Sequence, residues 1–274
     1  MFDFRDYLRL DMFPHILCPG CGHGIVLNAM LRAIHSLGLK KDEVMVISGI
    51  GCSSRLSGYV DFNTLHTTHG RPLAFATGIK LARPELNVIV ITGDGDGLSI
   101  GGNHLIHAAR RNLAMTCLLL NNEIYGMTGG QFAPTTTPGK LSTTSPQGQS
   151  ERTFDSCRLA EAAGATFVAR GITYEPMALE KLVAAALQHD GFSFVEILSD
   201  CPEFFGRFNR VGSPSDMLFT QKQHTLDAKA AAALPPERRK GKLLTGILYQ
   251  ETSASYSTTG AQNGGGRIRP DMQE

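Results

Sequence analysis

Four of the six cysteines in this chain stand in short stretches with glycine or proline nearby, where a thiol is free to do chemistry. Cys18 and Cys21 form a C-x-x-C pair in LCPGCGHG, Cys52 lies in GIGCSSR, and Cys201 lies in SDCPEF. In a reducing compartment, such a pair indicates metal or redox chemistry rather than a structural disulfide. Four thiolates suit either Zn²⁺ or a 4Fe–4S cluster, and residue types alone leave both possibilities open.

A second group of candidate residues ends two apolar runs that are typical of strands. Gly93, Asp94 and Gly95 end the run NVIVITGDG, and Asn121 and Asn122 end the run AMTCLLLNN. Both tips are expected at the C-terminal edge of a parallel sheet, where ligands bind in such folds. Glycines let the backbone approach a diphosphate, and the N–H groups at the start of the next helix favour its negative charge.

The same segment offers oxygen ligands to a hard divalent cation. Mg²⁺ takes about six oxygens and usually bridges protein to phosphate. Asp94 offers a carboxylate, Asn122 an amide oxygen and Ile124 a backbone carbonyl. The interval between GDG and the Asn pair resembles the thiamine diphosphate signature. The alternative is that the glycines only make a tight turn, with Asp94 capping a helix; Asp96 could equally cap the next helix.

Apolar periodicity predicts the elements that would bring these residues together. Five runs rich in Val, Ile and Leu lack in–out alternation, which predicts buried parallel strands. They are residues 44–50, 87–93, 114–121, 165–171 and 193–199. Helical patterns cover 24–38 and 175–190. This alternation predicts an α/β fold with a doubly wound parallel sheet. Cys52 and Cys201 each follow a strand, so they are expected at the same sheet edge as Asp94.

Two segments interrupt this alternation. Residues 133–152 have the Pro, Gly, Ser and Thr composition of a long loop, and such loops in compact domains are often functional. From about residue 225 the composition shifts again, which predicts an extension that contacts a partner or is partly disordered. We therefore expect a cofactor-binding α/β domain over 1–224 and a C-terminal extension over 225–274.

Six motifs, in this order, resemble the β subunit of 2-oxoacid:ferredoxin oxidoreductases: CPGCGHG, GIGCSSR, HTTHGRPLAFATGIKLA, GDGDGLSIGGNH, NNEIYGMTGGQFAPTT and SDCPEFFGRFN. The resemblance runs from about Cys18 to Asn209, and GILYQETSASY is similar to the family's C-terminal ending. It implies a domain that binds the diphosphate side of thiamine diphosphate. It also implies one 4Fe–4S cluster on Cys18, Cys21, Cys52 and Cys201, and Mg²⁺ on Asp94, Asn122 and Ile124.

The resemblance also implies which residues touch the organic cofactor. These are Ile50, Gly51, Cys52, Ser53, His69, Gly93, Asp94, Gly95, Asp96, Asn122, Ile124 and Tyr125. His69, in HTTHGR, is the residue assigned to catalysis. The alternative is a structural histidine whose hydrogen bonds are satisfied by its neighbours.

The activity that the resemblance implies is CoA-dependent oxidative decarboxylation of a 2-oxoacid to an acyl-CoA and CO₂. A bound thiazolium supplies the electron sink, and the cluster passes electrons to ferredoxin. The substrate favoured is 2-oxoglutarate, with pyruvate and branched-chain or aryl 2-oxoacids as alternatives. Some relatives carry a Lys where this chain has Gly129, in YGMTGGQ. Arg55 and Arg71 are therefore the candidates for binding a second carboxylate; the alternative for each is a structural role or a place on the diphosphate side.

A partner chain is also expected. In this superfamily, the pyrimidine half of the cofactor site comes from a second α/β domain, and this chain has strands for one sheet. The resemblance implies a larger α subunit that supplies a pyrimidine-side Glu and the CoA contacts, in an (αβ)₂ or larger hetero-oligomer. A non-oxidative thiamine-dependent decarboxylase would share GDG and NN but would not need the cysteines. A non-catalytic zinc- or cluster-binding scaffold would leave Asp94 and Asn122 unexplained.

Composition narrows the classes of partner. With a net charge of +1 over 274 residues, nothing favours nucleic acid or an anionic membrane surface. The apolar runs have the length of strands and fall short of the roughly 20 residues that a membrane span needs. The start, MFDFRDYLRLDMFPH, has scattered charges and does not resemble a signal peptide, so we expect a cytoplasmic protein. Cys117 and Cys157 are expected in the core.

Overall fold

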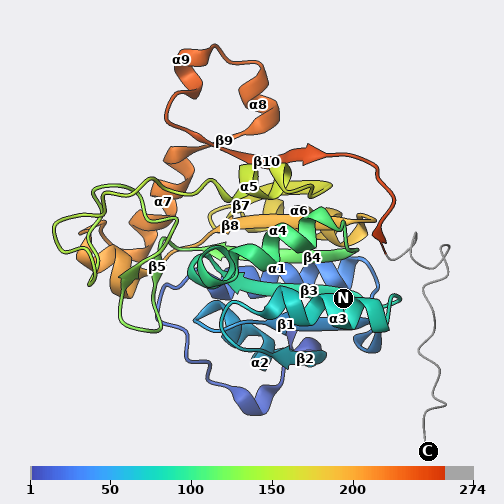
Figure 1. Cartoon of the computed structure of the whole chain (residues 1–274). Coiled ribbons are helices and arrows are strands. Elements are labelled where there is room, and N and C mark those ends of the chain that lie inside the picture. The colour runs from blue at the N-terminus through green and yellow to red at the C-terminus, as the bar shows by residue number, and fades with distance from the viewer. Residues whose placement is uncertain (1, 257–274) are drawn as a thin grey trace, which may run out of the picture.

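One eight-stranded sheet forms the centre of the molecule in the computed structural model, which describes residues 2–256 (Figure 1). The strands lie in the order β2-β1-β3-β4-β8-β7-β10-β9. Their bounds are β1 Val44–Ser48, β2 Asn63–His66, β3 Asn87–Gly93, β4 Met115–Asn121, β7 Phe167–Ile172, β8 Phe192–Leu198, β9 Thr225–Asp227 and β10 Leu243–Gln250. A separate hairpin pairs β5, Ile124–Tyr125, with β6, Gln131–Phe132.

The five predicted strands are confirmed as β1, β3, β4, β7 and β8. Each pairs in parallel with its neighbours among these five, and β2 adds a further parallel strand beside β1. Their side chains are buried on both faces, as their uninterrupted apolar runs require. The α/β, doubly wound class is therefore confirmed.

Helices cover both faces of the sheet (Figure 1). Their bounds are α1 His23–Ser36, α2 Leu56–Tyr59, α3 Pro72–Ala82, α4 Gly102–Arg110, α5 Ser156–Ala162, α6 Pro176–Gln188, α7 Pro214–His224, α8 Ala228–Ala232 and α9 Pro236–Arg239. The two predicted helices are α1 and α6, which pack against each other and share one core with the sheet. A second core lies between the other face and α3, α4 and α5, and it contains Cys117 and Cys157 as expected.

The segment after residue 224 differs from the expected extension. Strand β10 pairs antiparallel with β7 and parallel with β9, so residues 225–250 complete the edge of the main sheet. The boundary at 224 therefore does not separate the sheet from a tail. β10 is the last strand but one in the sheet and its side chains are partly exposed, so its sequence carries a weaker apolar signal than the central strands. Residues 257–274 lie outside the described residues.

The loop over 133–152 contains neither helix nor strand, as predicted, yet it is tightly hydrogen-bonded to itself. The Gly139 N–H donates to the Gln149 carbonyl at 2.7 Å, and the Gln149 N–H donates to the Lys140 carbonyl at 2.9 Å. The Thr143 N–H donates to the Gly130 carbonyl at 2.8 Å, which fastens the loop to the end of the β5–β6 hairpin. Within the described part of the chain, no helix is long and apolar enough to span a membrane.

Candidate active site

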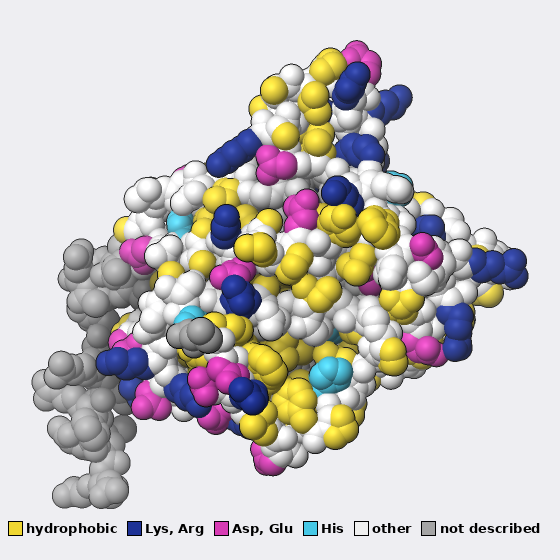
Figure 2. Space-filling model, turned by 180° about the vertical axis from the view of Figure 1, so that it is seen from behind, with side chains coloured by type: hydrophobic (Ala, Val, Ile, Leu, Met, Phe, Trp, Pro, Cys, Tyr) yellow, Lys and Arg dark blue, Asp and Glu magenta, His cyan; other side chains and the backbone are white. Residues whose placement is uncertain are grey.

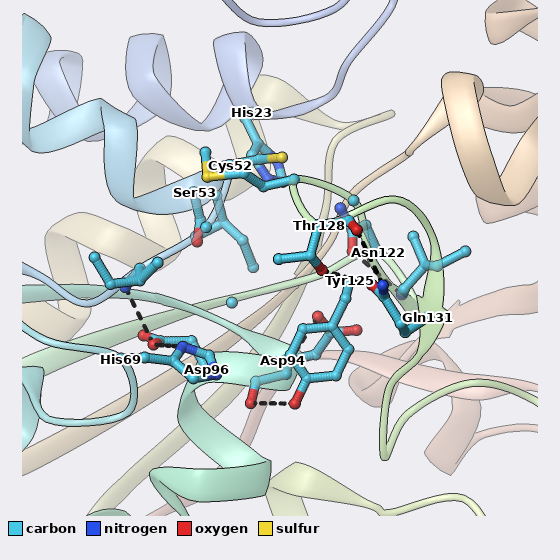
Figure 3. A pocket seen from close by; sticks show the side chains of 18 residues that line it. His23, Cys52, Ser53, His69, Asp94, Asp96, Asn122, Tyr125, Thr128 and Gln131 are labelled. Carbon is cyan, nitrogen blue, oxygen red and sulfur yellow. Dashed lines mark hydrogen bonds and ion pairs between the residues drawn. The ribbon is translucent and has the colours of Figure 1, made fainter. Parts of the chain in front are cut away.

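A cavity of about 500 Å³ lies at the C-terminal edge of the sheet, where the segments after β1, β3 and β4 converge (Figure 3). All twelve residues that the sequence analysis assigned to the cofactor line it: Ile50, Gly51, Cys52, Ser53, His69, Gly93, Asp94, Gly95, Asp96, Asn122, Ile124 and Tyr125. Parallel strands point their carboxyl ends the same way, so residues from distant parts of the sequence meet there. The residues predicted from the sequence therefore meet around a single cavity.

Asp94 is one of two buried carboxylates that line this cavity, and Asp96 is the other. Asp94 is only 3% exposed, directly after β3. Its Oδ1 accepts the Gly95 N–H at 2.9 Å, and its Oδ2 accepts the Thr135 hydroxyl at 2.6 Å. Burial raises the pKa of Asp94 to about 7, more than these hydrogen bonds lower it. Asp94 also caps the π-helical turn Gly95–Ile100, so the capping alternative describes part of its role.

Asn122 and Ile124 line the cavity where the chain leaves β4, the strand next to β3. The Asn122 Oδ1 accepts the Ile124 N–H at 3.4 Å, and both residues are buried. Glu123, between them, has a φ of 60°, so the backbone turns sharply here. Asn121 turns away from the cavity and donates to Glu196 Oε1 at 2.8 Å. Of the Asn pair, only Asn122 lines the cavity.

Tyr125 closes one side of the GDG turn. Its hydroxyl donates to the Gly95 carbonyl at 2.9 Å. A Cβ added at Gly95 would lie 2.4 Å from the Tyr125 ring, so the ring occupies the room that a side chain would need. Gly95 is therefore required by this packing as well as by any phosphate that approaches the turn.

Asp96 holds three segments around the cavity and does not merely cap a helix. Its Oδ1 accepts the backbone N–H groups of Ile50, at 3.1 Å, and Gly70, at 2.7 Å. Its Oδ2 accepts the Thr92 hydroxyl at 2.6 Å. His69 Nδ1 lies 2.7 Å from Asp96 Oδ1, but without hydrogen-bond geometry within the chain (Figure 3). The carboxylate thus fixes the loops that carry Ile50 and His69.

The four cysteines approach one another at one end of the cavity. Burial, followed by the neighbouring thiols, raises the pKa of Cys21 to about 12 and of Cys52 to about 11. A Cβ added at Gly126 would lie 3.3 Å from the Cys52 sulfur and 3.6 Å from the Cys201 sulfur. Cys18 is the exposed member of the group. No group of three or more His, Cys, Asp or Glu side chains in the described chain is arranged to hold a single metal ion.

Two contacts hold the cysteine-bearing segments together. The Gly22 N–H donates to the Asp200 carbonyl at 3.3 Å, and His23 Nδ1 lies 2.9 Å from Ser199 Oγ. A Cβ at Gly22 would lie 2.6 Å from the same Ser199 oxygen, so glycine is required at this crossing. Burial lowers the pKa of His23 to about 4, which leaves its imidazole neutral.

Six residues in the cavity wall were not predicted. They are His23, Leu120, Gly126, Met127, Thr128 and Gln131. Most belong to the β5–β6 hairpin, where Thr128 Oγ1 donates to Gln131 Oε1 at 2.5 Å. The available signals were the position of His23 directly after CPGCG and the YGMTGGQ motif itself. Arg55 and Arg71 do not line the cavity, and the Arg71 guanidinium donates instead to the Ile100 carbonyl at 3.1 Å.

Comparison with known proteins connects this geometry to a family. Residues 49–197 match the family described as "Thiamine pyrophosphate enzyme, C-terminal TPP binding domain". The chain is 50% identical over 240 residues to 2-oxoglutarate synthase subunit KorB of Methanocaldococcus jannaschii, covering 88% of this chain and 89% of that protein. It is 51% identical over 243 residues to the same subunit of Methanothermobacter marburgensis, covering 89% of this chain and 85% of that protein.

Comparison with a solved structure points to the same family. The chain resembles 2-oxoglutarate:ferredoxin oxidoreductase from Magnetococcus marinus, solved with 2-oxoglutarate, coenzyme A and succinyl-CoA bound. The TM-score is 0.86 at 36% sequence identity, with 98% of this chain and 93% of the other covered. The motifs, the cavity that they line and these relatives agree, and the chain belongs to the family of 2-oxoacid:ferredoxin oxidoreductase β subunits.

Proposed function

We propose that this chain, with an α subunit, carries out CoA-dependent oxidative decarboxylation of 2-oxoglutarate, and that electrons leave through a 4Fe–4S cluster to ferredoxin. The observation that carries the proposal is the shared wall of the cavity. Cys52 lines the cavity that contains Asp94 and Asn122, and its sulfur and that of Cys201 flank the same glycine. A decarboxylation site and an electron acceptor would then adjoin each other.

The residues of the cavity fit thiamine diphosphate with Mg²⁺. Among the described residues, four buried side-chain atoms have no hydrogen-bond partner within the chain, and one of them, His69 Nδ1, belongs to a residue that lines the cavity. Asp94 is a carboxylate whose charged form burial disfavours, and a cation offsets that cost. Asp94, Asn122 and the Ile124 carbonyl would hold Mg²⁺, which prefers oxygen ligands. The glycines at 93 and 95 would let the diphosphate approach.

The cysteines fit a 4Fe–4S cluster. Gly126 leaves open the space between the Cys52 and Cys201 sulfurs that a Cβ would enter. Each thiolate of such a cluster binds a different iron atom, so the ligands do not need to surround one ion. Burial raises the thiol pKa values of Cys21 and Cys52 and so disfavours their thiolates. Bound iron would offset this cost, because it favours the ionised sulfur. The alternative to a cluster is Zn²⁺ on the same cysteines, and the iron and zinc content of the purified complex distinguishes the two.

The residues of this chain would position and shield the reaction. Bound thiamine diphosphate supplies an electron sink for the carbanion left by loss of CO₂. Asp96 holds the backbone at Ile50 and Gly70, which sets the position of His69 at the cavity wall. His69 is 38% exposed, so its ring can reach a ligand. We assign His69 the catalytic role, as a hydrogen-bonding group beside the reacting atoms.

An α subunit would complete the site. Ile50 and Met127 line the cavity, yet each is 40% exposed, which is typical of apolar side chains that a partner covers. We propose that the α subunit brings the pyrimidine-side Glu and the CoA contacts, in an (αβ)₂ or larger assembly. The enzyme would act in the cytoplasm, where ferredoxin is available.

Two observations bear on the substrate. Relatives at about 50% identity are named for 2-oxoglutarate. Among the described residues, no Lys or Arg side chain lines the cavity, so a second carboxylate would meet its cation on the α subunit.

Purified αβ complex should therefore form acyl-CoA fastest from 2-oxoglutarate in a panel with pyruvate, branched-chain and aryl 2-oxoacids. A preference for pyruvate would overturn the substrate assignment, and CO₂ release without ferredoxin reduction would favour a non-oxidative decarboxylase.

A further inference from the structure

Thr135 makes a contact with the candidate metal site that the sequence analysis did not anticipate. It lies near the start of the 133–152 loop and is 2% exposed. Its hydroxyl donates to Asp94 Oδ2 at 2.6 Å. The other oxygen of the same carboxylate accepts the Gly95 N–H at 2.9 Å. Both oxygens are therefore restrained, and a carboxylate oxygen with one hydrogen bond can still accept a cation.

The loop fixes Thr135 independently of Asp94. The hydroxyl of Thr136 donates to the Glu123 carbonyl at 2.5 Å, and the Thr137 N–H donates to the Glu123 carboxylate at 2.8 Å. The Gln149 amide donates to the Thr136 carbonyl at 2.9 Å. The two residues that follow Thr135 are therefore tied to the segment that also carries Asn122 and Ile124. Its hydroxyl is held in place before any ligand arrives.

From this geometry, we propose that Thr135 is a positioning residue that sets the Asp94 carboxylate for a divalent cation. This inference rests on the proposed function, because it concerns the same metal site. A donor that orients a metal-binding carboxylate typically contributes about 10- to 100-fold to metal affinity. Without the Thr135 hydroxyl, Asp94 Oδ2 would lose its hydrogen-bond donor. The Asp94 side chain could then rotate away from the proposed Mg²⁺ site that it shares with Asn122.

The test is the Mg²⁺ affinity of the αβ complex at saturating thiamine diphosphate, measured by calorimetric titration. Thr135→Val replaces the hydroxyl with a methyl group of similar size, and Thr135→Ser keeps the hydroxyl. Thr116→Val is the matched control, since Thr116 is also buried and its hydroxyl donates to the Ala186 carbonyl far from the cavity. Thermal unfolding of all variants reports on the fold.

We expect Thr135→Val to weaken Mg²⁺ binding by about 10- to 100-fold. Thr135→Ser should stay within about threefold of the wild-type affinity, and Thr116→Val should match the wild type. Wild-type affinity in Thr135→Val would overturn the inference. So would equal losses in the Val and Ser variants that follow their unfolding temperatures, because that pattern indicates a packing role alone. Failure of the wild-type complex to bind thiamine diphosphate and Mg²⁺ would instead overturn the proposed function, and the inference with it.

Discussion

Cys52 and Asp94 line one cavity, although they follow different strands and carry groups suited to different cofactors. Cys52 follows β1 and Asp94 follows β3, and these two strands are adjacent and parallel. Their carboxyl ends therefore bring a thiol and a buried carboxylate to the same wall. In the proposed reaction, this adjacency would connect the decarboxylation site with the electron acceptor.

Replacement of Asp94 separates the two halves of the proposed site. Asp94→Ala removes the only carboxylate among the three proposed Mg²⁺ ligands and should lower thiamine diphosphate affinity by more than about 100-fold. The cysteines do not depend on this side chain, so the visible absorbance of the cluster should persist. Calorimetry and a visible spectrum of the anaerobic complex measure both. Loss of both properties would show that the site assignment is wrong.

The pH dependence of metal binding follows from the burial of Asp94. Burial raises the pKa of this carboxyl to about 7 in the metal-free chain, so a proton must leave before the carboxylate binds Mg²⁺ below that pH. Apparent Mg²⁺ affinity should therefore fall by up to about tenfold per pH unit below about 7 and level off above it. Titrations across this range measure the slope. Affinity that is flat below neutral pH would contradict the account.

Replacement of Cys201 tests the cluster ligands. Cys201→Ala should lower the iron content of the anaerobically purified complex and bleach its visible absorbance, while some CO₂ release from the 2-oxoacid remains. Cys117→Ala is the matched control, because Cys117 is a buried cysteine in the core between the sheet and helices α3, α4 and α5. An iron content that Cys201→Ala leaves unchanged would remove Cys201 from the ligand set.

Gly126 tests whether the space between the sulfurs is used. A Cβ there would lie 3.3 Å from the Cys52 sulfur, which is tighter than ordinary packing, so Gly126→Ala should reduce cluster occupancy. Gly78→Ala, in α3, is the control, since its added Cβ meets no atom within 4 Å. Iron per complex is the measurement. Equal iron content in both variants would mean that nothing fills the space beside Gly126.

The central strands and the cavity could be predicted because each leaves a local mark in the sequence. Buried parallel strands are continuous apolar runs, and the glycines of GDG stand where the backbone turns at the sheet edge. Gly95 shows why the motif is strict, since Tyr125 occupies the space beside it. The burial of Cys117 followed from its place within such a run.

Other features depend on contacts between distant segments and leave no such mark. The hydrogen bond between Thr135 and Asp94 joins a loop to a strand tip, and loop composition does not indicate it. The Arg71 guanidinium donates to the Ile100 carbonyl and does not line the cavity, which agrees with the structural alternative and which its charge alone did not indicate. β10 escaped prediction because its pairing with β7 and β9 is made by backbone groups, and its partly exposed side chains form no continuous apolar run.

The most direct test of the central claim is the visible spectrum of the anaerobically purified αβ complex before and after addition of 2-oxoglutarate and CoA. We expect a broad brown absorbance that bleaches only when both the 2-oxoacid and an intact Asp94 are present. Such bleaching would mean that the decarboxylation site delivers electrons to a cluster on these cysteines. A colourless complex that contains zinc would overturn the proposed electron transfer, because the cysteines would then be structural and electrons would have no path from the cavity.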